Sequence, residues 1–147
     1  MASKTIAQFA NNFPDFSRDI VNALLKTWNR ETLFTLDAAK EGVSDDTGAP
    51  VASGDLQGSG TALNAKVTSK GIASQIVFSV PYAARLNDEG SGIILKKPGE
   101  VSSRRRGQII TKAKTGELGF LNNAIEREKQ SIFDAVQDTI AKVWRDL

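Results

Sequence analysis

The side chains most able to form a metal-binding site are two pairs of neighbouring carboxylates, Asp45-Asp46 and Asp88-Glu89. Carboxylate oxygens are the ligands that hard cations such as Ca²⁺ prefer. Neighbouring loop residues rarely converge on one ion without further ligands, and Asp45, Asp46 and Asp55 do not match the spacing of a calcium loop. The pairs are therefore interpreted as solvated turn residues, and no metal is expected.

A glycine-rich stretch from Gly54 to Gly60 is the second candidate, because backbone amides in such loops can bind phosphates. The stretch lacks the Gly-Lys-Ser/Thr ending of a P-loop, and it precedes a predicted strand rather than a helix. Neither a nucleotide nor any other cofactor is therefore expected.

Catalysis is limited by what the chain lacks, because it contains no cysteine and no histidine. This excludes disulfides, thiolate nucleophiles, Cys- or His-ligated metals and the Ser–His–Asp arrangement. Asp, Glu, Lys and Tyr can still catalyse some reactions, so an enzyme remains a third class of function that a cleft of distant carboxylates would favour. The prediction is a protein that is not an enzyme and has no catalytic residues.

The strongest charge signal is a basic segment between Lys96 and Lys114. It carries seven basic residues and Glu100, a net charge of +6, which leaves −4 for the rest of a chain of net charge +2. An acidic body with one basic loop predicts a negatively charged partner. No aromatic residue lies between Glu89 and Glu117 to stack on bases, so an acidic protein surface and the DNA backbone stay open as targets. The candidate contact residues are Lys96, Lys97, Arg104, Arg105, Arg106, Lys112 and Lys114.

Two helices are predicted in the first 41 residues. The first is short, over residues 3–12, and is broken at Asn11-Asn12. The second begins at Pro14, since proline fits the first turn of a helix, and it ends near Lys40. Its apolar residues have amphipathic spacing: Phe16, Ile20, Leu24 and Trp28, with Val21 and Leu25 beside them.

Residues 42–60 are predicted to form a loop, which is either a flexible connection or an ordered segment that makes contacts. Apolar alternation in 61–69 and 72–80, around a turn at Lys70-Gly71, predicts an antiparallel hairpin. The expected apolar face of the first strand is Leu63, Ala65 and Val67. The expected apolar face of the second strand is Ile72, Ile76, Phe78 and Val80, interrupted by Ser74.

Beyond the hairpin, Tyr82 to Leu86 is expected to form one or two helical turns. Residues 91–115 are a predicted long loop, with 93–95 and 109–110 as candidate arms of a second hairpin. Thr115 is the candidate cap of the last helix. The apolar stripe of that helix favours packing against the sheet and the first helix over docking into a partner's groove. The stripe consists of Leu118, Leu121, Ile125, Ile132, Val136, Ile140, Val143 and Leu147, widened by Phe133 and Trp144.

This order predicts an α+β fold, in which a small antiparallel sheet packs with an N-terminal helix and a long C-terminal helix, with a long basic loop between the sheet and the last helix. One domain over 1–147 is expected, divided into 1–41 (helical), 42–60 (loop), 61–90 (hairpin and short helix), 91–115 (basic loop) and 116–147 (C-terminal helix). The exposed edges of a small sheet favour pairing with another copy. No apolar run reaches the roughly 20 residues that span a bilayer, and no signal-peptide core is present, so a cytoplasmic protein is expected.

Three short motifs follow one another between Pro50 and Ala124. They are PVASGDLQGS at 50–59, VPYA at 80–83 with Glu89-Gly90 after it, and Phe120-Leu121 with Ala124. In this order they resemble the P-V-x-T-G-x-L-x-x-S loop, the V-P-Y-A segment and the Phe-Leu helix start of the tail-completion, or head–tail joining (neck), proteins of tailed bacteriophages. Ser53 stands in the threonine place, and the spacing from Tyr82 to Glu89-Gly90 is longer than usual in that group.

The resemblance implies a structural virion protein that forms a homo-oligomeric ring, often of six or twelve copies, between head and tail. Its partners would be itself, head adaptor or portal proteins, and tail tube or tail terminator proteins, with passive contact with packaged DNA and no membrane. It would lie in the virion neck or tail, and in the host cytoplasm during assembly. The alternatives are a tail terminator, a minor capsid protein, or a nucleic-acid-binding module that uses the basic loop.

Tyr82, Asp88 and Glu89 are expected at the junction between the hairpin and the basic loop. Tyr82 is predicted to anchor this junction rather than to contact a ligand. The acidic pair Asp88-Glu89 is a predicted docking point for the arginines of a neighbouring copy.

Overall fold

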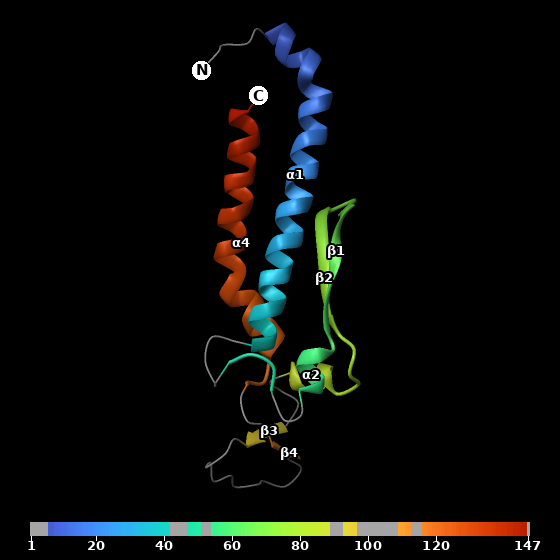
Figure 1. Cartoon of the computed structure of the whole chain (residues 1–147), viewed down its shortest axis with the longest axis vertical. Helices are drawn as coiled ribbons and strands as arrows, with labels where there is room; N and C mark the ends of the chain where they lie inside the picture. Colours follow the sequence, from blue (N-terminus) through green and yellow to red (C-terminus); the bar gives the residue numbers. More distant parts are fainter. Residues whose placement is uncertain are drawn as a thin grey trace.

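The computed structural model describes residues 6–41, 47–50, 54–88, 93–96, 109–112 and 116–146, with the backbone alone for 6–14, 93–96 and 109–112. Figure 1 shows two long helices lying side by side in opposite directions, with a hairpin beside the first of them and the short elements near one end. The predicted α+β class is confirmed. Among the described residues, none of the helices is long and apolar enough to cross a bilayer. The elements are α1 (Ile6–Glu41), α2 (Asp55–Gly58), β1 (Gly60–Thr68), β2 (Gly71–Phe78), α3 (Ala83–Leu86), β3 (Ile93–Lys96), β4 (Ile109–Lys112) and α4 (Phe120–Arg145).

The N-terminal region is a single helix, so the predicted break at Asn11-Asn12 and the start at Pro14 are wrong. Proline has no amide hydrogen and costs an interior helix one hydrogen bond, but the turns on either side can continue. The first turns of α1 bend away from the axis of the remainder (Figure 1), a distortion that an interior proline produces.

Helix α4 runs antiparallel to α1 and packs along it. At the far end from the sheet, the rings of Phe16 and Trp144 meet edge to face, with centroids 5.7 Å apart. Midway along the pair, the hydroxyl oxygens of Thr27 and Thr139 lie 2.6 Å apart. The Thr139 hydroxyl donates to the carbonyl of Ala135, so Thr27 is the donor between the two threonines.

The C-terminal helix is confirmed, but it begins at Phe120, with Gly119 at the N-cap position and no side-chain cap of its own. The candidate cap Thr115 lies outside the described residues. Glu117 precedes the helix and accepts a hydrogen bond of 2.8 Å from Arg127. Of the predicted apolar stripe only part is covered, because Ile125, Phe133, Ile140 and Trp144 remain exposed.

The predicted hairpin is confirmed, with β1 antiparallel to β2 and Gly71 at φ +129° after the turn. A β-bulge lies between Leu63 and Lys66, where Asn64 and Ala65 oppose the single residue Ser74. The bulged amide of Ala65 donates to the side-chain oxygen of Asn29 on α1 at 2.6 Å. A bulge breaks the strict alternation of a strand.

The predicted apolar face of β1 is wrong for Leu63, which the bulge turns outward, and for Val67, which lies beyond the bulge, whereas Ala65 is half-buried as predicted. Leu63 and Val67 are both exposed, and the half-buried positions are Ala62 and Ala65. On β2 the expected alternation holds, since Ile72, Ile76 and Phe78 are half-buried while their neighbours are exposed.

The buried core lies where the short elements meet α1 and the start of α4. It consists of Ala39, Ala49, Leu56, Ala83, Leu86, Phe120 and Ala124. Phe120 is the largest side chain fully buried among the described residues, and its ring meets Phe78 edge to face at 5.0 Å. Burying a phenylalanine contributes about 1.5–3 kcal/mol to stability.

The described parts of the predicted loop, 47–50 and 54–60, are ordered and make contacts. Ala49 and Leu56 belong to the core, and α2 forms one helical turn there. The amide of Ala49 donates to the carbonyl of Ala39 at 2.7 Å, and Gly48 accepts from the amide of Glu117 at 3.0 Å. Of the two alternatives for this segment, the contact-making one therefore holds for these residues.

The second predicted hairpin is wrong, because β3 pairs with β4 in parallel, with Ile93 opposite Ile109 and Lys96 opposite Lys112. A parallel pair needs a crossover connection, whereas a hairpin turn joins only antiparallel strands. Apolar runs show where strands form, but they carry no information about the relative direction of two strands.

Candidate functional site

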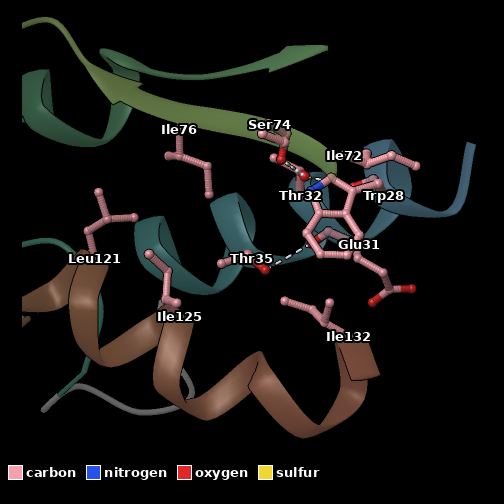
Figure 2. Close-up of a pocket in the computed structure, with 11 residues that line it drawn as sticks. Trp28, Glu31, Thr32, Thr35, Ile72, Ser74, Ile76, Leu121, Ile125 and Ile132 are labelled. Carbon is pink, nitrogen blue, oxygen red and sulfur yellow. Dashed lines mark hydrogen bonds between the residues drawn. The ribbon is translucent and has the colours of Figure 1, made fainter. Parts of the chain in front are cut away.

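An apolar groove of about 330 Å³ lies where α1, β2 and α4 come together. Its floor is α1, and β2 and α4 form its two walls (Figure 2). Ile76 of β2 and Ile125 of α4 point toward one another across it. The lining residues are Trp28, Glu31, Thr32, Thr35, Ile72, Ala73, Ser74, Ile76, Leu121, Ile125 and Ile132.

Hydroxyl groups on the floor hold β2 against α1. Thr32 donates to the carbonyl of Trp28 at 2.7 Å, and its oxygen lies 2.6 Å from that of Ser74. Because the one hydroxyl hydrogen of Thr32 is donated to Trp28, Ser74 must be the donor in the hydrogen bond between Ser74 and Thr32. The polar interruption of the β2 face is therefore a second anchor of the hairpin on α1, beside the hydrogen bond from Ala65 to Asn29.

Of the described residues that line the groove, Glu31 is the one with an acidic side chain, and it is 6% exposed. One carboxylate oxygen, Oε1, accepts from Nε of Arg30 at 3.2 Å, and Arg30 itself is largely exposed. Within the described part of the chain, Oε2 has no hydrogen-bond or ion-pair partner. Buried carboxylates are stable only when their oxygens are hydrogen-bonded, so this one has a remaining capacity for a donor.

A second, shallower cleft of about 420 Å³ lies on the opposite flank of the α1–α4 pair. It carries both signs of charge, from Arg30 and Lys142 against Asp134 and Asp138. No group of three or more metal-ligating side chains occurs among the described residues. The charged side chains of this second cleft are exposed, and two positive charges balance two negative ones, which suits a solvated surface better than catalysis.

The predicted basic residues are only partly described. The register places Lys96 of β3 directly opposite Lys112 of β4, so the structure brings these two positions together. Lys97, Arg104, Arg105, Arg106 and Lys114 lie outside the described residues.

The junction residues are described except for Glu89, which lies outside the described part. Tyr82 is the N-cap residue of α3 and is exposed, while the buried contacts of the junction come from Ala83 and Leu86. Asp88 follows α3 at the surface. The anchoring role of Tyr82 and the docking role of the acidic pair stay predictions.

The groove itself was not predicted from the sequence. A signal was present in α1, where Glu31, Thr32 and Thr35 interrupt an otherwise amphipathic pattern. All three are buried polar residues, and such residues need partners within the fold or from outside it.

Among known proteins, no family model, no curated protein and no solved structure matches this chain. The resemblance to head–tail joining proteins rests on its three short motifs.

Proposed function

We propose that the chain is a structural virion protein that forms an oligomeric ring in the neck or tail of a tailed phage and joins the head to the tail. The observation that carries this proposal is the amount of large apolar surface left exposed on a small body. Monomeric proteins rarely expose such surface in continuous patches, and it commonly marks a protein interface. Among the described side chains of the two long helices, the large exposed ones are Leu33, Phe34, Ile125, Phe133, Ile140 and Trp144.

The proposed partners are further copies of the chain, in a ring of six or twelve, together with head adaptor or portal proteins and tail tube or tail terminator proteins. The basic segment 91–115 is proposed to reach an adjacent subunit, an adjoining ring or packaged DNA. The proposed location is the virion, after assembly in the host cytoplasm. A role as a tail terminator or a minor capsid protein is the alternative within this proposal, and it would use the same contacts with further copies and with neighbouring virion proteins. No catalytic activity is proposed.

Class averages of the purified protein by electron microscopy test this proposal, together with class averages of virion necks. Rings of fixed copy number, or density for the chain between head and tail, support it. A protein that stays monomeric both alone and with its neighbours contradicts it.

A nucleic-acid-binding module is the second candidate function. It is favoured by the pairing of Lys96 with Lys112 inside a segment of net charge +6. Binding through phosphate contacts falls steeply as salt rises, because each contact releases a counterion. Titration with DNA between low and physiological salt measures this slope, and absence of binding at low salt removes this candidate.

A further inference from the structure

Helix α4, which forms one wall of the groove, carries a second apolar surface next to it. Phe133, Ile140 and Trp144, here called the ridge, follow one another at spacings of seven and four residues and are 56%, 41% and 58% exposed. Such spacings place side chains on one face of a helix. Trp144 touches Phe16 at its edge and still keeps this exposure.

The ridge and the groove form one continuous face of α4. Successive residues of a helix differ by about 100° around its axis. The step from Ala124 to Ile125 leads from the buried core to the groove wall. The step from Ile132 to Phe133, in the same direction around the helix, leads from the groove wall to the ridge. The ridge is therefore the shoulder of the groove that points away from α1.

We propose that the occupant of the groove is a second copy of this chain. The ridge of each copy lies in the groove of the other, and the two α4 helices run antiparallel about a two-fold axis near the middle of the helix. A two-fold contact joins the same surface patch on both subunits, so the patch must complement itself. A convex apolar ridge beside a concave apolar groove meets this requirement, because the axis between them exchanges the two.

The charges of the face agree with this occupant. Among the described residues the second carboxylate oxygen of Glu31 has no donor, and a donor that enters the groove with the apolar side chains would satisfy it. Lys129 is exposed on α4, four residues after Ile125 and four before Phe133, so it stands between the groove wall and the ridge. Its ammonium lies 3.9 Å from Glu126 in an exposed pair, which contributes little and is readily exchanged. In the pair of copies, Lys129 of one is the donor to Glu31 of the other.

This contact goes beyond the proposed function, since it applies to the free protein whatever structure the protein builds. If a separate contact closes a ring, added two-fold pairs give stacked rings with an even number of copies.

The first experiment is sedimentation velocity of the purified full chain over a range of concentrations. The expected result is a monomer–dimer equilibrium whose dissociation constant rises at least tenfold in Phe133→Glu, because a charge replaces a central apolar anchor. Val77→Glu is the matched control, since Val77 is 42% exposed on β2 but belongs to neither groove nor ridge. Lys129→Glu is expected to weaken the dimer and Lys142→Glu, on the opposite flank, to leave it unchanged. Circular dichroism checks that each variant is folded.

The second experiment tests the two-fold geometry. The chain has no cysteine, so a single introduced one is a unique probe. Val136→Cys lies near the middle of the face, and a short bismaleimide is expected to link it to its own copy as a covalent dimer. Asp138→Cys, in the opposite cleft, is the control that stays unlinked.

Three results overturn the proposal: a monomer at every concentration, a dissociation constant equal in Phe133→Glu and Val77→Glu, or no covalent dimer from Val136→Cys. A head-to-tail contact gives the last result, because it does not bring a residue near its own copy. Rings that form normally from Phe133→Glu protein contradict the pairing and leave the proposed ring function standing.

Discussion

The side-chain oxygen of Asn87 accepts a hydrogen bond of 2.9 Å from the amide of Leu121, 34 positions later, and a second of 3.2 Å from Asn122. These amides belong to the first turn of α4, where no preceding turn supplies acceptors. Gly119 offers no side-chain cap. The residue that ends α3 therefore caps the second long helix, and the hairpin side of the molecule is coupled to the start of α4.

Asn87→Ala is expected to destabilise the fold by about 1 kcal/mol, the usual cost of losing a helix cap. Urea denaturation followed by circular dichroism measures the change. Asn87→Asp keeps an acceptor and adds negative charge at a helix N-terminus, so it should retain most of the stability. Equal losses in the two variants would show that the hydrogen bonds to α4 are not the cause.

Gly116→Ala is expected to destabilise the fold by more than about 1 kcal/mol. Gly116 has φ +106°, and an added Cβ would lie 2.5 Å from the Cα of Pro50. Gly58→Ala is the matched control, since its Cβ would meet no atom within 4 Å and its φ is ordinary. Thermal melts of both variants test the prediction, which is wrong if they agree.

Ser74→Ala and Thr32→Val are expected to cost about 1 kcal/mol each, with a double variant that loses clearly less than the sum. Their oxygens lie 2.6 Å apart, so either change alone removes the same contact between β2 and α1. A double-mutant cycle in urea measures the coupling. Strict additivity would mean that this hydroxyl pair does not hold the hairpin on α1.

Replacement of Arg104, Arg105 and Arg106 by alanine is expected to leave the melting temperature unchanged and to impair joining of heads to tails. The reason is that three adjacent arginines add charge to a basic segment, and arginine is rarely part of an apolar core. Plaque titre and DNA retention of assembled particles are the measurements. Lys70→Ala, at the exposed hairpin turn, is the control. Normal yields of infectious particles from the triple variant would contradict a role for the segment.

Lysines in place of Asp88 and Glu89 are expected to produce a joining defect that glutamates in place of the three arginines restore. The rescue follows if the acidic pair of one copy meets the basic segment of the next, because the swap preserves the attraction while reversing both signs. The same particle assay measures it. A defect that persists in the combined variant would exclude this pairing.

Much of the fold could be predicted because the signals are local. The spacing from Phe16 to Trp28 predicts a helix wherever it lies in space, and the alternation from Ile72 to Phe78 predicts a strand with one covered face. The predictions were wrong where a contact with a residue distant in the sequence changed the local structure. The Ala65 amide finds Asn29 on α1, which accommodates the bulge and turns Leu63 outward.

The amino-acid sequence by itself determined the types and order of the main elements, the absence of thiol and imidazole chemistry, and the concentration of positive charge before the last helix. Only the tertiary structure decided that β3 and β4 run parallel, that Asn87 caps α4, and that β2 and α4 leave a groove over Glu31. Periodicity depends on the backbone geometry of each segment alone, so it can be found along the chain. The direction of strand pairing, the capping of a helix by a distant residue and the formation of a groove depend on which segments pack together. Packing over the whole fold determines this.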